Sequence, residues 1–498
     1  MRYDAIIIGS GVSGLTAAII LAQEGRRVLV VEQHSRAGGL MQHFRRGPFL
    51  FPTGVHRLGS LDPGQILWRY FAYLGVLDRL ALNRLDPEGF EEYCFPGLTF
   101  RVPQGLEAFQ ERLHRHFPGE KRQIDSFCRD LRQTVSQFAL YNLTGRPPGL
   151  PQLWDDSRSL AAYLDDLGCS RELQAVLSAN NPLYGIPPDQ CPLPTHFLVF
   201  DSFLQSSWRV DEYLTPLAEA FRQSLMDKGG EVRCGARVTA IPTASQQTLG
   251  VTLAGGEFLE GGLVIFTGHP RHLLDLCLPE AFRPAFRNRL LEARDTIGAF
   301  SLALAWNHPD CVLAQRDAIL YNSWDTGAPY RQKLVGTDAT PGMVFVSAAS
   351  RPTAEGYAVV ALIGMKPEDM EPFEETRRGN RSEAYRAAKA SVAERLVNIL
   401  KARWPQQTQG LRIMDTATPL TFRDYTLAPR GTAYGIIKGA GNFRHSQFSA
   451  ETRVKNLFLA GQSIIQPGVL GALISGVHVA GVILGREYLV ERIIKATL

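Results

Sequence analysis

The stretch from Asp4 to Glu32 constrains the fold of this chain more than any other. Residues 4–8 form a short apolar run, residues 9–14 read Gly-Ser-Gly-Val-Ser-Gly, residues 15–24 are interpreted as a helix, and the apolar run 28–31 ends at Glu32. A strand, a GxGxxG turn, a helix, a second strand and an acid in this order make one complete dinucleotide-binding βαβ unit. This order favours an ADP-containing cofactor over a glycine-rich turn without function.

Each residue type in this unit has a physical role. Gly9 permits the tight turn, Gly11 lets the backbone approach a pyrophosphate, and Gly14 lets the helix pack closely on the strand. The free amides at the start of the helix face the negative charge of the phosphates. Glu32, at the end of the second strand, is predicted to accept hydrogen bonds from the ribose hydroxyls of an adenosine.

Further glycine motifs, at opposite ends of the chain, indicate which cofactor this is. Residues 36–40 read Arg-Ala-Gly-Gly-Leu, residues 456–462 read Asn-Leu-Phe-Leu-Ala-Gly-Gln, and residues 467–472 read Pro-Gly-Val-Leu-Gly-Ala. With these motifs the chain resembles the FAD-dependent phytoene desaturase-like family, and within it the branch of retinol saturase and carotenoid isomerase.

Four segments, spread over nearly the whole length, carry the resemblance. They are the first unit with its Gly-Gly extension and residues 53–59, 264–270 and 461–472. The run Gly54-Val55-His56 is similar to a Gly-Ile-His sequence of the saturase branch. The third segment departs from the family's Asn-Ala-Asp-Pro, because Gly268 and His269 replace the Ala and the Asp.

The resemblance implies an α/β fold built on a Rossmann-type FAD-binding domain of the glutathione-reductase-like kind. We expect residues 1–90, 206–295 and 411–498 to form that domain from discontinuous segments. Residues 91–205 are predicted to form a helical cap and substrate region, in which residues 91–102 form a strand pair and the cap over the substrate channel begins at about residue 105. Residues 296–410 are predicted to form a substrate domain with a mixed sheet and a helix. The apolar run from Ile66 to Leu82 is interpreted as one helix that is buried or faces a lipophilic substrate or lipid.

The resemblance also implies the residues that hold FAD. Most of them belong to the glycine motifs, and Val238 is expected to hold the adenine through its backbone. The complete predicted set is Gly9, Ser10, Gly11, Val12, Ser13, Gly14, Glu32, Gln33, Gly38, Gly39, Leu40, Gly54, Val55, His56, Val238, Gly461, Gln462, Gly468, Gly471 and Ala472.

Polar side chains for catalysis are few. In the resembling family the loop that contains His56 runs beside the isoalloxazine ring, so His56 is a candidate proton donor, or a histidine that only bonds to backbone or to a flavin carbonyl. Tyr434 and His445 are further candidates in the channel.

A second GxGxxG unit for NADPH is absent from the sequence, because Gly439-Ala440-Gly441 lacks the preceding parallel strand and the acid. Electrons are therefore expected to pass through a diffusing reductant, a quinone, oxygen or a protein partner, unless the reaction has no net redox change.

The function that these features favour is an FAD-dependent oxidoreductase acting on C=C bonds of a long apolar polyene, a carotenoid or a retinoid. Abundant aliphatic and aromatic residues without a clustered acid or base suit a neutral apolar substrate whose reaction depends on positioning. Saturation is favoured, with cis–trans isomerisation or desaturation as alternatives. A flavin amine oxidase and a non-catalytic FAD-containing lipid-binding protein remain rival hypotheses.

Composition narrows the kinds of partner, metal site and membrane segment that we expect. A net charge of +4 over 498 residues does not indicate nucleic acid as a partner, and it does not argue against an anionic membrane surface. Seven cysteines without a CxxC pair favour reduced thiols, and no metal site is expected.

The apolar run 464–485 contains glycines and a proline that suit a turn and helix beside a cofactor, so we expect no spanning helix and no signal peptide. The predicted location is cytoplasmic, with peripheral attachment to the inner face of the membrane as a possibility.

Overall fold

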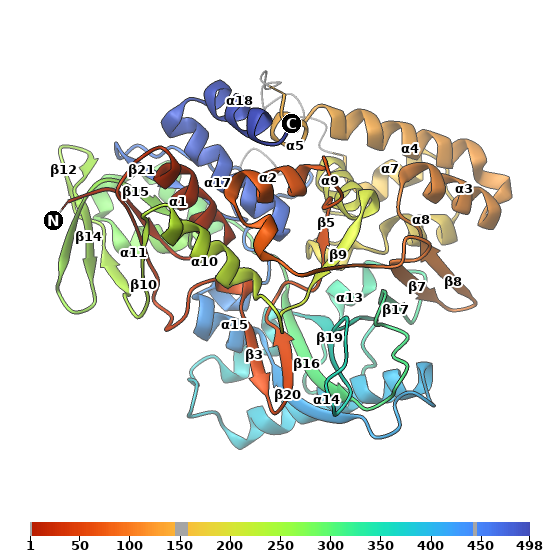
Figure 1. The fold of residues 1–498 in the computed structure, drawn as a ribbon. Coiled ribbons are helices and arrows are strands. Elements are labelled where there is room, and N and C mark those ends of the chain that lie inside the picture. The colour runs from red at the N-terminus through yellow and green to blue at the C-terminus, as the bar shows by residue number, and fades with distance from the viewer. Residues whose placement is uncertain (1, 145–157, 442–445) are drawn as a thin grey trace.

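Two sheets and a layer of helices organise the chain (Figure 1). The computed structural model describes residues 2–144, 158–441 and 446–498. Within these residues each of the two large sheets has seven strands. The first sheet lies at the left in Figure 1, the second lies below, and helices α3, α4, α7, α8 and α9 cover the upper right.

The first sheet is the predicted nucleotide-binding sheet. Its order is β10-β2-β1-β15-β14-β11, and β21 pairs with β15. The central pairs are parallel, whereas β14 runs antiparallel to its two neighbours. The central strands are apolar and buried, as expected of a parallel sheet covered on both faces. The strands are β1 (Tyr3–Ile8), β2 (Val28–Val31), β10 (Glu231–Arg233), β11 (Val238–Ala240), β14 (Gly250–Leu253), β15 (Phe258–Phe266) and β21 (Leu457–Leu459).

Three helices from distant parts of the chain pack together against this sheet. They are α1 (Val12–Gln23), α10 (Leu217–Asp227) and α17 (Gly468–Leu484). Helix α17 lies very close to α1, because a Cβ atom on Gly476 would lie 2.5 Å from the carbonyl oxygen of Ser13. Both ends of the chain therefore contribute to one domain, as the sequence predicts.

The second sheet is mostly antiparallel. Its order is β20-β16-β19-β18-β17-β7-β8, and helix α14 (Glu383–Arg403) packs on it through residues such as Leu396 and Leu400. The parallel pair is β17 with β7, in which Asp317 lies opposite Glu91. The strands are β20 (Arg412–Ala417), β16 (Gly298–Trp306), β19 (Tyr357–Met365), β18 (Met343–Ala348), β17 (Asp317–Tyr321), β7 (Glu91–Phe95) and β8 (Leu98–Val102).

Strands β7 and β8 form the strand pair predicted at residues 91–102. This pair extends the second sheet next to β17. The physical reason is that β17 offers a free edge, whose backbone groups β7 satisfies. The predicted domain boundaries stay predictions.

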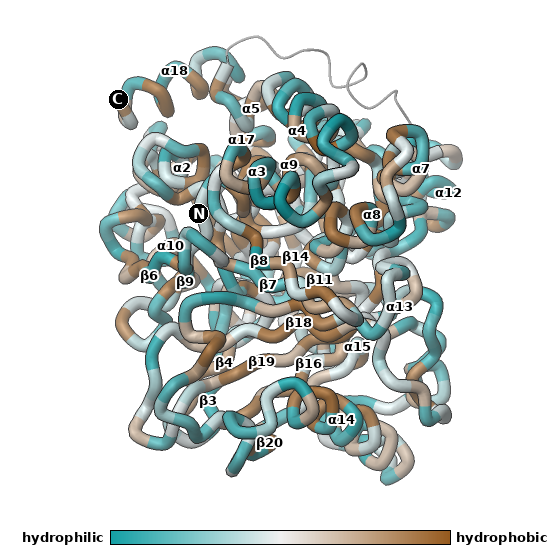
Figure 2. The backbone as a smooth tube through the Cα atoms, turned by 90° about the vertical axis from the view of Figure 1, so that its right-hand side faces the viewer, coloured by the Kyte–Doolittle hydropathy of each residue, from teal (hydrophilic) through white to brown (hydrophobic). Residues whose placement is uncertain are grey.

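The helical layer follows these strands in the sequence. Figure 2 shows that α3 and α4 are mainly hydrophilic where they face outward. Their apolar positions, such as Phe109 and Phe127, are fully buried against Phe200 of α9. The helices are α3 (Leu106–His116), α4 (Lys121–Ser136), α5 (Ala139–Asn142), α7 (Leu160–Asp166), α8 (Arg171–Ser178) and α9 (Leu193–Gln205).

Shorter elements connect these layers. A three-stranded sheet of order β5-β9-β6 joins the helices to the site described below. The strands are β3 (His43–Arg46), β4 (Phe49–Pro52), β5 (Leu58–Gly59), β6 (Leu82–Arg84), β9 (Ser207–Val210), β12 (Thr243–Ala244) and β13 (Gln247–Thr248). The helices are α2 (Ile66–Leu74), α11 (Leu273–Leu276), α12 (Pro284–Glu292), α13 (Ala328–Arg331), α15 (Pro419–Thr426) and α18 (Arg486–Ala496).

Helix α2 is shorter than predicted. The sequence was interpreted as one helix from Ile66 to Leu82, but α2 ends at Leu74. Gly75 adopts a left-handed conformation with φ 69°, and its amide donates to the carbonyl groups of the last turn, which ends the helix. The side chains of α2 are mostly buried. Among all described residues, no helix is both long enough and apolar enough to cross a bilayer.

The close approach of α17 to α1 leads to a stability prediction. A methyl group at position 476 would also lie 2.8 Å from Cβ of Thr16, so Gly476→Ala should overpack this contact and lower the free energy of unfolding by about 1–3 kcal/mol. Gly481→Ala in the same helix is the matched control, because its nearest new neighbour would be Cα of Arg486 at 3.5 Å. Urea denaturation should show the control to be unchanged or slightly more stable. Equal stability of Gly476→Ala and wild type would contradict this account.

Candidate functional site

Three neighbouring parallel strands end at one point of the first sheet. Gly9 follows β1, Thr267 follows β15, and Gly461 follows β21 after one residue. The Thr267 hydroxyl donates to the carbonyl oxygen of Ile8 at 2.8 Å. Gly9 has φ 101° and Gly461 has φ 122°. A Cβ added to Gly9 would lie 2.5 Å from the Thr267 hydroxyl oxygen, and one added to Gly461 would lie 3.1 Å from the Thr267 carbonyl oxygen. The absence of side chains leaves bare backbone at the carboxyl ends of the strands, where open α/β sheets bind their ligands.

The carboxylate of Glu32 is fixed at the end of β2. Its Oε2 accepts hydrogen bonds from the Ser10 amide at 3.0 Å and from the Ser10 hydroxyl at 2.6 Å, and Oε1 accepts from the His34 amide at 2.8 Å. The Ser10 hydroxyl in turn accepts from the Gly38 amide at 3.0 Å. Ser10 thus ties the glycine turn, the acid and the Gly-Gly pair together. Glu32 is only 9% exposed, so the carboxylate is held in place before any ribose arrives.

The first turn of α1 offers a place for a pyrophosphate. Gly11 is the N-cap of α1, and a Cβ added to it would meet no atom within 4 Å. The space above the helix N-terminus is therefore open, and backbone amides and the helix dipole favour an anion there. Gly14 is required for the fold itself, because a Cβ on it would collide with the carbonyl oxygen of Gly9.

The start of α17 completes this cradle. The Ser13 hydroxyl donates to the Ala472 carbonyl at 2.5 Å, and the Gly461 amide donates to the Ser475 hydroxyl at 3.0 Å. A Cβ on Gly471 would lie 2.5 Å from the carbonyl oxygen of Gln466, so the turn before α17 closes tightly. The structure therefore brings the predicted C-terminal residues to the N-terminal glycine turn.

Most of the remaining predicted cofactor residues lie in segments next to this cradle. The Thr53 hydroxyl donates to the Gln42 carbonyl at 2.9 Å, and a Cβ on Gly54 would lie 3.1 Å from Cβ of Leu40, so residues 38–40 and 53–54 are neighbours. The Ala236 amide donates to the Glu32 carbonyl at 2.8 Å. The segment that leads to Val238 therefore passes beside the end of β2, although the contact between Val238 and an adenine stays a prediction.

Two of these predicted residues bond to other parts of the chain. The side-chain amide of Gln33 donates to the Tyr425 carbonyl at 3.4 Å, and the side-chain amide of Gln462 donates to the Ala433 carbonyl at 3.3 Å. Both bonds tie edges of the cradle to the segment that precedes the C-terminal strand.

His56 occupies the loop between β4 and β5 with an unusual environment. Its ring packs edge-on against Phe345 of β18, with ring centroids 5.5 Å apart. Its Nδ1 is buried and has no hydrogen-bond partner among the described residues. Burial lowers the pKa of His56 to about 4, although Asp317 opposes this shift. His56 is therefore a neutral imidazole at neutral pH, with one nitrogen available to a ligand.

A buried ionic cluster, which the sequence did not indicate, holds the segment after His56. Arg57 Nη2 lies 2.7 Å from Glu91 Oε1 and Nη1 lies 3.0 Å from Asp317 Oδ2. Arg209 Nη2 lies 2.5 Å from Asp317 Oδ1. Burial alone would raise the pKa of Asp317, but the guanidinium groups of Arg209 and Arg57 together have the larger effect, so the pKa of Asp317 lies below its usual value. The cluster ties the loop to β9 and to two strands of the second sheet.

The other candidate catalytic residues are placed differently. Tyr434 packs beside Gly185, its amide donates to the Thr296 hydroxyl at 3.0 Å, and burial raises the pKa of its phenol to about 12. It is not among the described residues that line either cavity below. His445 falls outside the described residues. The catalytic roles of His56, Tyr434 and His445 stay predictions.

The departure at positions 268 and 269 has a structural explanation. His269 Nδ1 accepts a hydrogen bond from the Arg271 amide at 3.3 Å, so histidine takes the N-cap position of the short helix that follows. Its Nε2 lies 2.8 Å from Asp295 Oδ1. Histidine therefore caps the turn as an aspartate would, and it gains an acidic partner from the neighbouring segment.

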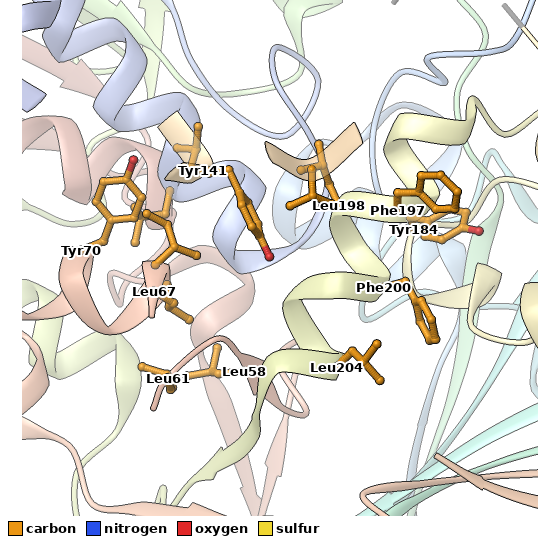
Figure 3. Packing of buried hydrophobic residues seen from close by; sticks show 14 of the residues in the cluster. Leu58, Leu61, Leu67, Tyr70, Tyr141, Tyr184, Phe197, Leu198, Phe200 and Leu204 are labelled. Carbon is orange, nitrogen blue, oxygen red and sulfur yellow. The ribbon is translucent and has the colours of Figure 1, made fainter. Parts of the chain in front are cut away.

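Two cavities adjoin the cradle. The first has a volume of about 140 Å³ and lies between α17, α9, α2 and α5; Figure 3 shows Leu58, Leu67, Tyr141 and Leu198 from four different segments around it. The second has a volume of about 60 Å³ and is lined by His56 and by polar residues of the turn after β9, such as Glu212. Arg57 and Leu58 line both cavities, so the two cavities adjoin at these residues. Among the described residues, no group of three His, Cys, Asp or Glu side chains could hold a metal ion.

Comparison with known proteins identifies the kind of site. A family model described as flavin-containing amine oxidoreductase matches residues 12–484. The chain belongs to this family. Members are FAD-dependent oxidoreductases, and the cradle fits FAD because its fixed acid, open helix N-terminus and side-chain-free turns suit a ribose and a pyrophosphate.

Individual relatives of this flavin-containing chain refine the comparison. The human all-trans-retinol 13,14-reductase is 27% identical over 539 residues, which cover 98% of this chain and 86% of the relative. The hydroxyneurosporene desaturase of Rubrivivax gelatinosus is 25% identical over 512 residues, which cover 95% of this chain and 92% of the relative. These relatives confirm the resemblance to the retinol saturase and carotenoid isomerase branch.

A solved structure supports the fold. A redesigned putrescine oxidase matches with a TM-score of 0.63 over 97% of this chain and 99% of that chain, at 16% sequence identity. The predicted α/β fold with a Rossmann-type FAD-binding domain is confirmed, and so is FAD as the cofactor of this oxidoreductase.

The fixed carboxylate gives a test of the cradle. Glu32→Gln replaces one carboxylate oxygen by an NH2 group, which would then face the backbone N–H of Ser10 or of His34, donor against donor. FAD affinity should therefore fall at least about tenfold. Fluorescence of released FAD measures this loss. Glu257→Gln is the matched control, since Glu257 is exposed and pairs with Arg233, and it should bind FAD as wild type does. Unchanged affinity in Glu32→Gln would contradict the assigned role.

Proposed function

We propose that this FAD-dependent oxidoreductase saturates a C=C bond of a long apolar polyene of the retinoid or carotenoid class. The observation that carries the proposal is the larger cavity, because Gly468 and Gly471 belong both to its lining and to the predicted FAD cradle. A substrate in this cavity therefore has one end next to the cofactor. The names of the two relatives, a retinol reductase and a carotenoid desaturase, support the same substrate class.

The lining of the cavity favours a polyene over an amine. Most of the lining residues are aliphatic or aromatic, and among the described residues none is an aspartate or a glutamate. A protonated amine buried here would have no opposite charge to bind, which is costly. The cavity thus argues against the flavin amine oxidase alternative, although the family's name includes amines.

Bound FAD supplies hydride transfer to or from carbon. The residues of this chain position the substrate and exclude water, since α2, α5, α9 and α17 line the cavity mostly with apolar side chains.

Saturation also needs a proton for the neighbouring carbon. His56 and Glu212 both line the smaller cavity, and burial raises the pKa of Glu212 to about 7. Glu212 can therefore hold a proton at neutral pH, whereas His56 is neutral. We propose that the smaller cavity supplies the proton and that His56 acts as a hydrogen-bonding group close to Arg57 and Leu58, where the two cavities adjoin.

The electron donor and the location belong to the same proposal. We propose a diffusing reductant or a protein as the donor, since the sequence contains one dinucleotide unit. An apolar substrate dissolves mainly in lipid, which supports peripheral binding to a membrane surface, and we propose the inner face of the cytoplasmic membrane as its site.

A half-reaction tests the proposed function. The FAD-loaded protein is reduced with dithionite without oxygen and mixed with all-trans-retinol. We expect the flavin to be reoxidised while the polyene absorbance moves to shorter wavelength, because one conjugated bond is lost, and mass spectrometry should show a gain of two hydrogen atoms. A product of unchanged mass but altered geometry would instead support isomerisation, and loss of hydrogen with the oxidised protein would support desaturation.

Variants connect this reaction to the site. His56→Gln should slow flavin reoxidation by about 100-fold, the usual scale for a positioned hydrogen-bonding or proton-transferring group. His34→Gln, which changes a histidine that lies beside the cradle but lines neither cavity, is the matched control. If no polyene reoxidises the flavin, the proposed substrate class is wrong.

A further inference from the structure

The larger cavity follows one face of α17. Leu470, Ile474 and His478 are four residues apart and all line it, so this face spans about 12 Å. The opposite face of α17, with Ala472 and Gly476, packs against α1. The cavity therefore lies on the side of α17 that faces away from the pyrophosphate end of the cradle, and it runs from Gly468 towards His478.

The end of the cavity at His478 is basic. Arg486, the first residue of α18, also lines the cavity, and its Nη2 lies 3.5 Å from Nδ1 of His478. Burial lowers the pKa of His478 to about 4, and the positive charges of Arg486 and Lys438 add to this shift. His478 is therefore neutral. Because its Nδ1 faces the guanidinium donor, its Nε2 carries the hydrogen and presents a second donor.

No acid compensates this basic end within the described part of the chain. Arg486 makes no ion pair there, none of the described lining residues is acidic, and Nε of Arg486 is buried without a hydrogen-bond partner. A cation at the start of a helix is also opposed by the helix dipole, so the position does not benefit α18. Arg492, further along the same helix, lies 3.5 Å from Glu24.

A nearby lysine adds to the positive potential. Lys438 is 3% exposed, and its ammonium group donates to the carbonyl of Ile465. Burial lowers its pKa to about 7, and the described residues provide no carboxylate for it. An apolar cavity that ends in an uncompensated guanidinium group beside a neutral histidine donor has the polarity expected for an amphiphile with an anionic end.

We propose that the substrate is an isoprenoid with a carboxylate end group, which Arg486 and His478 bind while the chain lies along α17 towards the cofactor. This inference rests on the proposed function, because it concerns the same cavity. It goes further by specifying the end group and the orientation of the chain. Arg486 and His478 are then substrate-binding residues, remote from the reacting bond.

A pair of ligands that differ only in charge tests the proposal. All-trans-retinoic acid and its methyl ester share the chain and the carbonyl group, but only the acid is anionic at neutral pH. Binding to the FAD-loaded protein is measured by quenching of tryptophan fluorescence. We expect the acid to bind about tenfold to a hundredfold more tightly than the ester, the range typical of one charge-assisted contact.

Two variants assign the effect to the basic end. Arg486→Gln should remove most of the preference for the acid and leave the affinity for the ester unchanged. Arg492→Gln on the same helix is the matched control and should keep the preference. Equal binding of acid and ester to wild type, or equal weakening of both ligands by Arg486→Gln, would overturn the end-group inference and leave the proposed function standing. Failure of both ligands to bind would overturn both.

Discussion

The contact between α1 and α17 is the constraint on which the rest of the structure depends. Residues more than 450 positions apart meet through the hydrogen bond from Ser13 to the Ala472 carbonyl, and Gly476 allows the two helices to touch. The contact brings the C-terminal glycine turn to the N-terminal one, so the predicted FAD cradle is built from both ends of the chain. It also orients the other face of α17 towards the larger cavity.

The buried ionic cluster forms the second connection. Arg57 pairs with Glu91 and Asp317, and through them the loop that carries His56 is fixed to the second sheet. A buried charge that loses one partner is strongly destabilising, so the four members hold one another in a single arrangement. Arg57, a member of this cluster, lines both cavities, so the apolar and the polar cavity adjoin at the cluster.

The sequence predicted well the features that depend on short-range order. Gly9, Gly14 and Glu32 belong to one local βαβ unit, whose geometry follows from residue type and spacing, and their contacts are observed. The approach of Gly461 and Ala472 to that unit came from the family resemblance, since no local pattern determines it. Long-range pairing was missed, because the addition of the 91–102 hairpin to β17 depends on which sheet edge is free. The left-handed turn at Gly75 was missed because the apolar run continues past it.

The residues proposed for the site also divide into those that the sequence indicates and those that only the fold reveals. The residues of the predicted FAD cradle could be proposed from the sequence because glycine and one acid at fixed positions have a specific chemical role, and the structure brings them together. Arg57 and Arg486 gave no signal, because arginine is common on surfaces and only the fold shows which of its partners are near. His269 shows that a departure from a family motif can keep the local function, here the capping of a turn.

Hydrogen–deuterium exchange of the protein with and without FAD tests most directly whether both ends enclose one cofactor. The account predicts that FAD protects the amides of residues 9–15 and of residues 461–476 together, with the same dependence on FAD concentration. Protection of the N-terminal unit alone, with residues 461–476 unchanged, would contradict it.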